Sequence, residues 1–176
     1  MQLRPYQQDA VDSAIAWMKK CKSPAVLELA TGAGKSWIAA AIAKWFIENA
    51  QKKVLILQPS LELTEQNYSK WIATGEKASI FSASANSKCT RYDVIYGTPK
   101  TVLNSIERFG DKFGLIIIDE CHQITPTIKE IISKIKSKNE RLRVIGMTAT
   151  PYRMNTGYIY HQNLVTNKAL AEEEAI

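Results

Sequence analysis

The hydrophobic residues of this chain fall into short continuous runs that alternate with stretches of helical spacing. The continuous runs predict buried strands at residues 25–29, 54–57, 79–81, 94–96, 114–118 and 144–147. Helical spacing and helix-start signals predict helices at residues 5–20, 35–49, 61–72, 99–109 and 127–138. Alternating strands and helices are typical of a mainly parallel sheet with helices on both faces, so the pattern predicts an α/β fold.

Two segments lack a regular apolar pattern. Residues 82–90 are small and polar, which predicts a loop, and regularity is lost again after Pro151. We therefore expect one domain at residues 1–153, followed by a linker at residues 154–176. The end of this linker, from Lys168 onward, is acidic and helix-like.

The segment between the first predicted strand and the second predicted helix is rich in glycine. A glycine turn before a helix wraps backbone N–H groups around a polyphosphate and aims the helix N-terminus at it. The residues that would line the phosphates are Thr31, Gly32, Ala33 and Gly34. Lys35 would neutralise the outer phosphates, and the hydroxyl of Ser36 would hold Mg²⁺. Leu29 stands where the general motif has its first glycine, and a strand–turn–helix corner without a ligand is the alternative.

A second motif follows the apolar run at residues 114–118. This run ends in Asp119 and Glu120, and two adjacent carboxylates at the tip of a buried strand are costly unless a cation or a reaction uses them. In a nucleotide hydrolase, Asp119 would orient Mg²⁺ and Glu120 would polarise the attacking water. Taken alone, the motif could be a polar strand end before a turn. Together, the two motifs predict ATP and Mg²⁺ as cofactors, with Lys35, Asp119 and Glu120 as catalytic residues.

Composition narrows the class of protein further. The chain has 176 residues, 45% of them hydrophobic, which is enough for one α/β domain with a core. Its net charge of +6 favours a polyanionic partner such as nucleic acid. The three cysteines show no C-x-x-C spacing, which argues against a zinc site or a disulfide framework and suits a reducing cytoplasm. No apolar run approaches the length of a membrane span, so we expect a soluble, intracellular protein with no membrane partner.

The order of these motifs resembles the first RecA-like domain of superfamily 2 helicases and translocases, which implies a RecA-like P-loop fold. The run Leu-Arg-Pro-Tyr-Gln at residues 3–7 looks like the adenine-reading element of that family, which implies that Arg4 and Gln7 contact the base. Residues 30–36 look like motif I, and residues 119–122 look like a DEAH-like motif II. Within the superfamily, the chain is most similar to restriction-enzyme helicase subunits and phage UvsW-type DNA helicases.

Three further motifs extend the resemblance. Residues 58–63 resemble motif Ia and residues 97–99 resemble motif Ib. By this resemblance, nucleic acid is expected to contact Pro59, Ser60, Gly97 and Thr98. Residues 148–151 resemble motif III, which in the family links the ATP state to the grip on the strand. The coupling residues implied are Thr148 and Thr150, and His122 is expected to bridge motif II to them.

The resemblance implies an ATP-binding domain that couples hydrolysis to movement or unwinding of nucleic acid, with DNA favoured over RNA. The family also needs a second RecA-like domain that carries an arginine finger, and no segment after Pro151 resembles one. The chain alone is therefore expected to turn over little or no ATP. An RNA helicase of the same superfamily stays open as an alternative, as do a P-loop phosphotransferase and a binding platform without activity.

Several candidate residues also have a simpler interpretation. Arg4 and Gln7 alone would form an ordinary polar face of a first helix. Thr98 before a proline is how many helices begin, and a helix start of this kind is also compatible with phosphate binding. Pro59–Ser60 fits an ordinary turn between a strand and a helix. Cys121 is expected to pack in the core, because no base is assigned to it.

Overall fold

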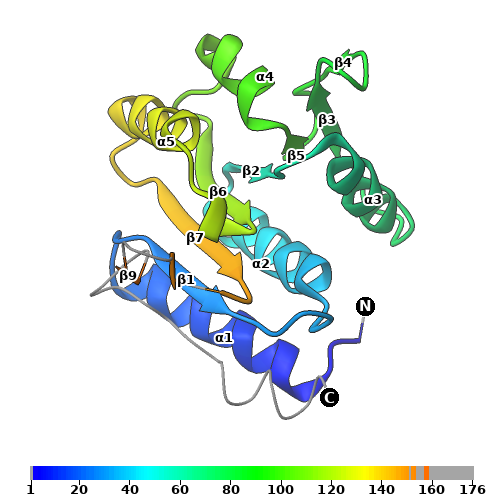
Figure 1. The fold of residues 1–176 in the computed structure, drawn as a ribbon, viewed down its shortest axis with the longest axis vertical. Coiled ribbons are helices and arrows are strands. Elements are labelled where there is room, and N and C mark those ends of the chain that lie inside the picture. The colour runs from blue at the N-terminus through cyan, green and yellow to red at the C-terminus, as the bar shows by residue number, and fades with distance from the viewer. Residues whose placement is uncertain (1, 151, 154–156, 159–176) are drawn as a thin grey trace.

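The structure, a computed structural model, describes residues 2–150, 152–153 and 157–158 (Figure 1). The helices are α1 (Pro5–Lys20), α2 (Lys35–Ala50), α3 (Leu61–Ile72), α4 (Pro99–Asn104) and α5 (Pro126–Lys138), with 3₁₀ turns η1 (Ile106–Arg108) and η2 (Cys121–Gln123). The strands are β1 (Ala25–Glu28), β2 (Lys53–Leu57), β3 (Ser79–Ser82), β4 (Ser87–Lys88), β5 (Val94–Gly97), β6 (Phe113–Asp119), β7 (Arg143–Thr148), β8 (Tyr152–Arg153) and β9 (Gly157–Tyr158).

Seven strands form one sheet in the order β1-β7-β6-β2-β5-β3-β4. Every neighbouring pair in it is parallel except β3 and β4, which are antiparallel at one edge. The predicted α/β fold with a mainly parallel sheet is therefore confirmed. The order is not the order of the sequence, since β7 lies between β1 and β6 (Figure 1).

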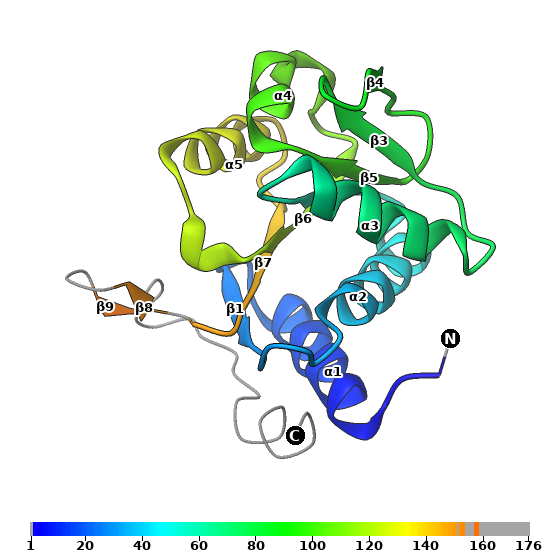
Figure 2. The ribbon, with the colours of Figure 1, turned by 45° about the vertical axis from the view of Figure 1, so that its right-hand side comes forward.

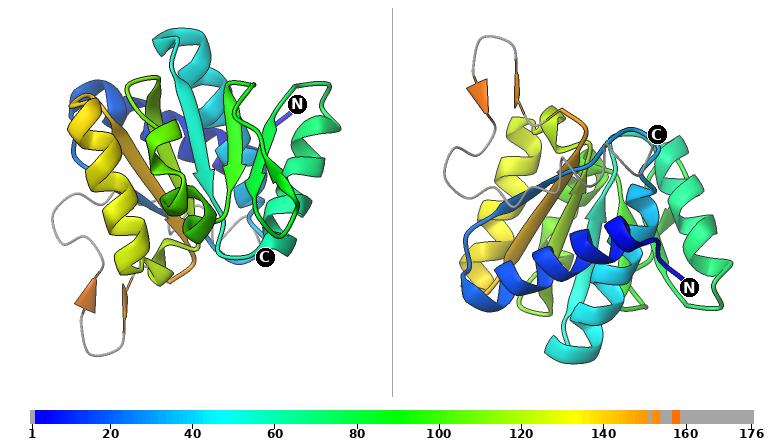
Figure 3. Two further views of the ribbon diagram at one scale, coloured as in Figure 1. Left: turned by 90° about the horizontal axis from the view of Figure 1, so that it is seen from above. Right: turned by 90° about the horizontal axis from the view of Figure 1, so that it is seen from below.

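Successive side chains of the central strands point into two separate hydrophobic layers. In β6, Leu115 and Ile117 pack with residues of α1 and α2, whereas Ile116 and Ile118 pack with residues of α5 and the α4 segment. Two further views show these helix pairs on opposite faces of the sheet (Figure 3). Burial on both faces explains why the strands are continuous apolar runs rather than alternating ones.

Helix starts follow local signals in the sequence. Proline occupies the first turn of α1, α4 and α5, where its missing N–H has no helical partner to lose. The hydroxyl of Ser60 accepts a hydrogen bond from the N–H of Leu63 at 3.3 Å and caps α3. Thr125 caps α5 in the same way, by accepting from the N–H of Ile128 at 3.4 Å. These caps fix the direction in which each helix leaves the sheet.

Two predicted elements differ from the structure. The helix predicted at 99–109 ends at Asn104, and the chain then turns so that Phe109 enters the core with its ring 4.9 Å from that of Phe81. The polar segment 82–90, predicted as a loop, contains β4, which pairs with β3. An edge strand has one unpaired side and little buried surface, so it carries no apolar pattern that sequence analysis could detect.

The short strands β8 and β9 form an antiparallel pair separate from the main sheet (Figure 2). Arg153 of β8 pairs with Gly157 of β9, so this pair crosses the domain limit predicted at residue 153. The predicted helix-like end at 168–176 lies outside the described residues. Within the described part of the chain, helices are too short or too polar to cross a bilayer.

Candidate nucleotide site and adjoining cleft

The carboxyl ends of β1, β7 and β6 lie side by side at one edge of the sheet. Glu28 of β1 pairs with Thr148 of β7, and Asp119 of β6 pairs with Met147 of β7. Leu29, in the place of the motif's first glycine, is fully buried, and its N–H donates to the carbonyl of Thr148 at 2.9 Å, so it prolongs β1. Ligands of α/β folds bind at such strand ends, and this sheet order brings three motifs together.

The glycine loop turns through two left-handed residues before α2 begins. Gly32 has a φ of 83° and Gly34 a φ of 77°, conformations that residues with a Cβ rarely adopt. Nothing lies within 4 Å of the place where a Cβ on Gly32 would be. Thr31 next to it is exposed, whereas Ala33 is buried. The loop therefore offers open backbone at the N-terminus of a 16-residue helix, an arrangement that suits phosphate.

Lys35 faces the paired acids, Asp119 and Glu120, and these three side chains border a narrow gap. Its Nζ lies 2.7 Å from Oε1 of Glu120, and the two side chains are 14% and 27% exposed. Asp119 is 9% exposed, and its Oδ1 accepts a hydrogen bond from the N–H of Glu120 at 3.0 Å. The convergence of the lysine and the acids that the sequence predicts is thus confirmed as geometry.

The environment of the paired acids is electrostatically demanding. Burial, with repulsion from Glu120, raises the pKa of Asp119 above the usual range of an aspartate, and Lys35 offsets part of this. Glu120 itself has a φ of 49°, a left-handed conformation that is uncommon for a residue with a side chain. Such backbone is found at functional sites, where surrounding contacts hold it in place.

Cys121, next to these acids, is fully buried and has a packing role. A Cβ on Gly146 of β7 would lie 2.7 Å from its Sγ, so the thiol fills the space that this glycine leaves. Burial, with the nearby negative charges, raises the pKa of the Cys121 thiol to about 12. A thiol of this kind stays protonated and inert at neutral pH, which agrees with the sequence interpretation.

His122 connects the acids to the end of β7. Its Nδ1 lies 2.9 Å from Oγ1 of Thr148 and 3.3 Å from Oε2 of Glu120. Thr148 is fully buried, and its Oγ1 also accepts a hydrogen bond from the N–H of Thr150 at 3.0 Å. The predicted contact of His122 is therefore present to Thr148, whereas the exposed Thr150 is bonded to Thr148 and not to His122 itself.

The Ser36 hydroxyl has a hydrogen-bond partner that the sequence does not indicate. Its hydroxyl donates to Oδ1 of Asn67 on α3 at 2.6 Å. Asn67 is 4% exposed and lies in the middle of a helix. Its sequence neighbours are mostly polar and gave no signal, because only the position of α3 beside α2 reveals the partner of Ser36.

A cavity of about 590 Å³ lies beside the glycine loop and collects the residues expected to read the base. The amide of Gln7 accepts from the N–H of Arg4 at 3.0 Å and donates to the carbonyl of Ala33 at 2.9 Å. The hydroxyl of Tyr6 donates to the same carbonyl at 3.0 Å. A Cβ on Gly34 would collide with the Gln7 amide. The lining residues are Gln2, Arg4, Tyr6, Gln7, Gly32, Gly34, Trp37 and Thr74.

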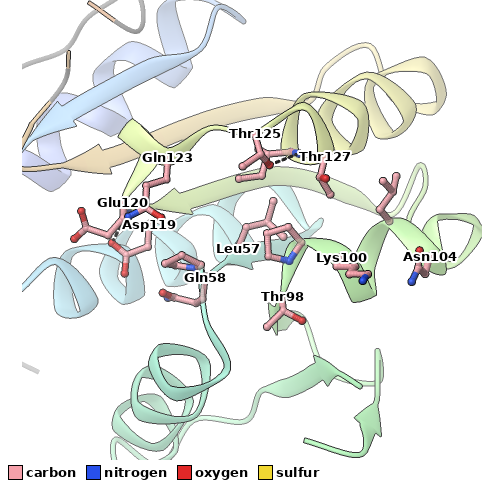
Figure 4. A pocket seen from close by; sticks show the side chains of 14 residues that line it. Leu57, Gln58, Thr98, Lys100, Asn104, Asp119, Glu120, Gln123, Thr125 and Thr127 are labelled. Carbon is pink, nitrogen blue, oxygen red and sulfur yellow. Dashed lines mark hydrogen bonds between the residues drawn. The ribbon is translucent and has the colours of Figure 1, made fainter. Parts of the chain in front are cut away.

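A second cleft, of about 520 Å³, has the two acids in its lining (Figure 4). Pro59, Thr98 and Asp119 line it. Ser60 is exposed at the start of α3, whereas Gly97 is buried in β5, and a Cβ on it would lie 2.8 Å from Cγ2 of Val102. Thr98 precedes α4 as predicted, but its hydroxyl donates to Oγ1 of Thr101 instead of capping the helix.

The oxygen atoms at the gap fit a magnesium ion held together with a nucleotide. Mg²⁺ prefers one or two carboxylates, hydroxyl or water oxygens, and phosphate oxygens. Asp119 and Ser36 offer a carboxylate and a hydroxyl of this kind. Among the described residues no group of three or more histidine, cysteine, aspartate or glutamate side chains could hold a metal by itself, so phosphate oxygens would have to complete the set.

Comparison with known proteins identifies the family. The family model described as "Type III restriction enzyme, res subunit" matches residues 1–153. The chain belongs to this family. Its fold is that of the N-terminal RecA-like domain of superfamily 2 helicases, as the motifs predict.

The res-subunit domain is similar to domains of larger proteins. It is 31% identical over 156 residues to the ATP-dependent DNA helicase uvsW of Enterobacteria phage T4, covering 82% of this chain and 29% of that protein. It is 27% identical over 175 residues to the mouse ATP-dependent RNA helicase DHX58, covering 86% of this chain and 25% of that protein. The chain thus spans less than a third of the length of these curated relatives.

Solved structures show the same fold. The crystal structure of the UvsW helicase from bacteriophage T4 superposes with a TM-score of 0.68 at 28% identity, covering 86% of this chain and 54% of that one. The Hef helicase domain of Pyrococcus furiosus superposes with a TM-score of 0.70 at 22% identity, covering 98% of this chain and 41% of that one.

Proposed function

We propose that this chain is the ATP-binding domain of an ATP-dependent helicase or translocase that acts on nucleic acid, with DNA favoured. The observation that carries the proposal is the meeting of Lys35 with Glu120, beside the buried Asp119, next to the glycine loop. Phosphoryl transfer is catalysed by positioning and by charges placed around the transferred group, and this gap holds groups suited to both.

The groups at the gap divide the work of ATP hydrolysis. Lys35 leaves Glu120 to bind the outer phosphates, and the backbone N–H groups of residues 31–34 bind the others. Ser36 and Asp119 would hold Mg²⁺, which would offset the negative charge of the phosphates. Glu120, released from Lys35, orients and polarises the attacking water.

The amide of Gln7 is equipped to read adenine. An amide has two donor hydrogens and two acceptor lone pairs, and the bonds to Arg4 and Ala33 use one of each. One donor and one acceptor are left. They match the adenine edge, where N7 accepts a hydrogen bond and N6 donates one. Arg4 and Trp37 line the same cavity and would enclose the base.

Nucleic acid binds across the second cleft in this proposal. Pro59, Ser60 and Thr98 lie there or at its rim, and such contacts to the backbone of a strand are independent of base sequence. Gly97, which is buried, acts by allowing the close approach of Val102 rather than by contacting the strand itself. The contacts from Glu120 through His122 to Thr148 and Thr150 couple this region to the nucleotide.

In this proposal, a second RecA-like domain completes the helicase or translocase. The relatives are more than three times as long as the segment that this chain matches, which supports the presence of such a partner domain. We assign residues 1–153 to the first domain and residues 154–176 to the connection, whose strand β9 pairs back with β8 at the end of the domain. Hydrolysis would then open and close two domains around one strand and move it stepwise.

RNA is the second candidate substrate, and the resemblance to the mouse RNA helicase favours it. Identity does not separate the two substrates, since a putative ATP-dependent RNA helicase of African swine fever virus is 32% identical and the phage DNA helicase is 31% identical. DNA is preferred because the matching family model describes a restriction enzyme subunit and the phage relative is a DNA helicase. Contacts to the 2′-hydroxyl distinguish the two, so competition between RNA and DNA strands of equal length for this chain measures the preference.

Nucleotide binding tests the proposal directly. Lys35→Ala should abolish binding of a fluorescent ATP analogue in the presence of Mg²⁺, because the main cation at the phosphates is lost. Lys44→Ala is the matched control, since Lys44 lies on the same helix but pairs with Glu76 at the surface, 2.7 Å away. Both variants should keep the circular dichroism spectrum of the wild type. Undiminished affinity in Lys35→Ala would contradict the site.

A further inference from the structure

The hydroxyl of Ser36 has a protein partner that fixes its orientation. A serine hydroxyl has one hydrogen to donate and two lone pairs to accept or to coordinate with. Here the hydrogen points to Oδ1 of Asn67 at 2.6 Å, a short bond, and Asn67 is 4% exposed. With its hydrogen engaged, the Ser36 oxygen keeps both lone pairs for a cation on its other side.

Helix α3, which carries Asn67, borders the nucleotide site along its length. Just before its start, Pro59 lines the cleft assigned to nucleic acid. Just past its end, Thr74 lines the cavity assigned to the base. One turn beyond Asn67, Lys70 is half-buried. Residues three apart share a helix face, so Asn67 and Lys70 both belong to the side turned toward the site.

We infer that Asn67 is a positioning residue for the metal: it orients the Ser36 hydroxyl toward Mg²⁺ and links that hydroxyl to the strand-binding end of α3. The inference rests on the proposed function. Ser60 and Asn67 are separated by seven residues, or about 10 Å along a rigid helix. A shift of α3 on binding a strand therefore moves the partner of a metal ligand, and outer-shell partners of this kind tune metal affinity.

The experiment measures how much Mg²⁺ tightens the binding of a fluorescent ATP analogue to the chain, as the ratio of Kd in EDTA to Kd in Mg²⁺. Asn67→Leu keeps the size of the side chain but removes the acceptor, and should lower this ratio about tenfold. Asn67→Asp keeps the acceptor, and should preserve or raise the ratio. Glu65→Ala, an exposed change on the same helix, should match the wild type.

A second measurement separates positioning from mere packing. In a chain that already carries Ser36→Ala, adding Asn67→Leu should not lower the ratio further, because the two residues act through one hydroxyl. Equal loss in Asn67→Leu and Asn67→Asp, an unchanged ratio in Asn67→Leu, or additive effects with Ser36→Ala would each overturn the inference. Absence of Mg²⁺-dependent binding by the wild type would instead refute the proposed function.

Discussion

The most consequential single contact is the ion pair between Lys35 and Glu120. At 2.7 Å it brings the proposed phosphate-binding cation onto the carboxylate proposed to act on water. While no phosphate lies between them, Lys35 and Glu120 therefore neutralise each other's charge. A site arranged in this way keeps its charges compensated until a nucleotide separates them.

Replacement of Glu120 by glutamine should tighten ATP binding, because Lys35 no longer has to leave a charged partner. A partly exposed pair of this kind is worth up to about 1 kcal/mol, so the Kd for ATP should fall about two- to fivefold. Titration with a fluorescent ATP analogue measures it. Glu130→Gln removes an exposed pair with Lys134 on α5 and should change nothing. Equal or weaker binding by Glu120→Gln would show that the pair does not compete with nucleotide.

Asp119→Asn should stabilise the chain at neutral pH. Because its pKa is raised in the folded state, the folded chain holds more protons than the unfolded chain above the ordinary aspartate pKa of about 4. Stability is therefore lost as the pH rises through that window, and the amide avoids the loss. A gain of about 1 kcal/mol would raise the melting temperature by about 2–4 °C at pH 7.

The advantage of Asp119→Asn should shrink as the pH falls toward 4 and vanish below it, where the wild-type carboxyl becomes protonated in both states. Thermal unfolding between pH 4 and pH 8 follows this change. Asp111→Asn alters an exposed carboxyl and serves as the control. A lower melting temperature for Asp119→Asn at pH 7 would mean that the carboxylate stabilises the fold instead.

At the scale of elements, the junction between β5 and α4 depends on one glycine. A Cβ on Gly97 would lie 2.8 Å from Cγ2 of Val102 and 3.4 Å from the carbonyl oxygen of Phe81. The helix therefore sits closer to the strand than any other residue at position 97 allows. The same junction forms one wall of the second cleft, so its packing sets the shape of that cleft.

Gly97→Ala should destabilise the chain by about 1–3 kcal/mol, the usual cost of overpacking a core. Val102→Ala removes the clashing methyl, so the two changes combined should cost at least about 0.5 kcal/mol less than their sum. Denaturant unfolding of the three variants gives this coupling. Gly110→Ala is the control, because its nearest neighbour is the flexible Lys138 side chain at 3.3 Å. Strict additivity would place the strain elsewhere.

Local chemistry made most elements and the nucleotide motifs predictable. Buried strands such as β6 are apolar on both faces, and the turn at Gly32 and Gly34 needs residues that tolerate positive φ. The edge strand β4 escaped prediction because it is short and carries no apolar pattern. The early end of α4 escaped prediction because it depends on the packing of Phe109 against Phe81, which is distant in sequence. For the same reason Asn67 could not be identified, since only the packing of α3 reveals its partner Ser36.

The whole molecule is basic, with a net charge of +6. Such a charge favours a polyanionic strand and makes its binding depend on salt. Within the second cleft, Lys100 is the exposed cation beside Thr98, at the start of α4. Its position makes it the natural probe for strand binding at this surface.

Lys100→Ala should weaken binding of single-stranded DNA and lower the slope of log affinity against log salt by about 0.7, the share of one phosphate contact. Fluorescence anisotropy with a labelled oligonucleotide at several salt concentrations gives the slope. Lys136→Ala, at the far end of α5 from the cleft, removes the same charge and should leave the slope nearly unchanged. Equal effects of the two variants would indicate binding through net charge alone.

The close approach of Gly34 to the Gln7 amide places the proposed phosphate contacts and the proposed base contacts next to each other. Any side chain at position 34 would push away the Gln7 amide, the group proposed to read the nucleobase, even if the loop still enclosed phosphate. Preference for ATP over GTP should therefore be lost before triphosphate binding is lost. A change at Gly34 would therefore require a compensating change at Gln7 of the first helix.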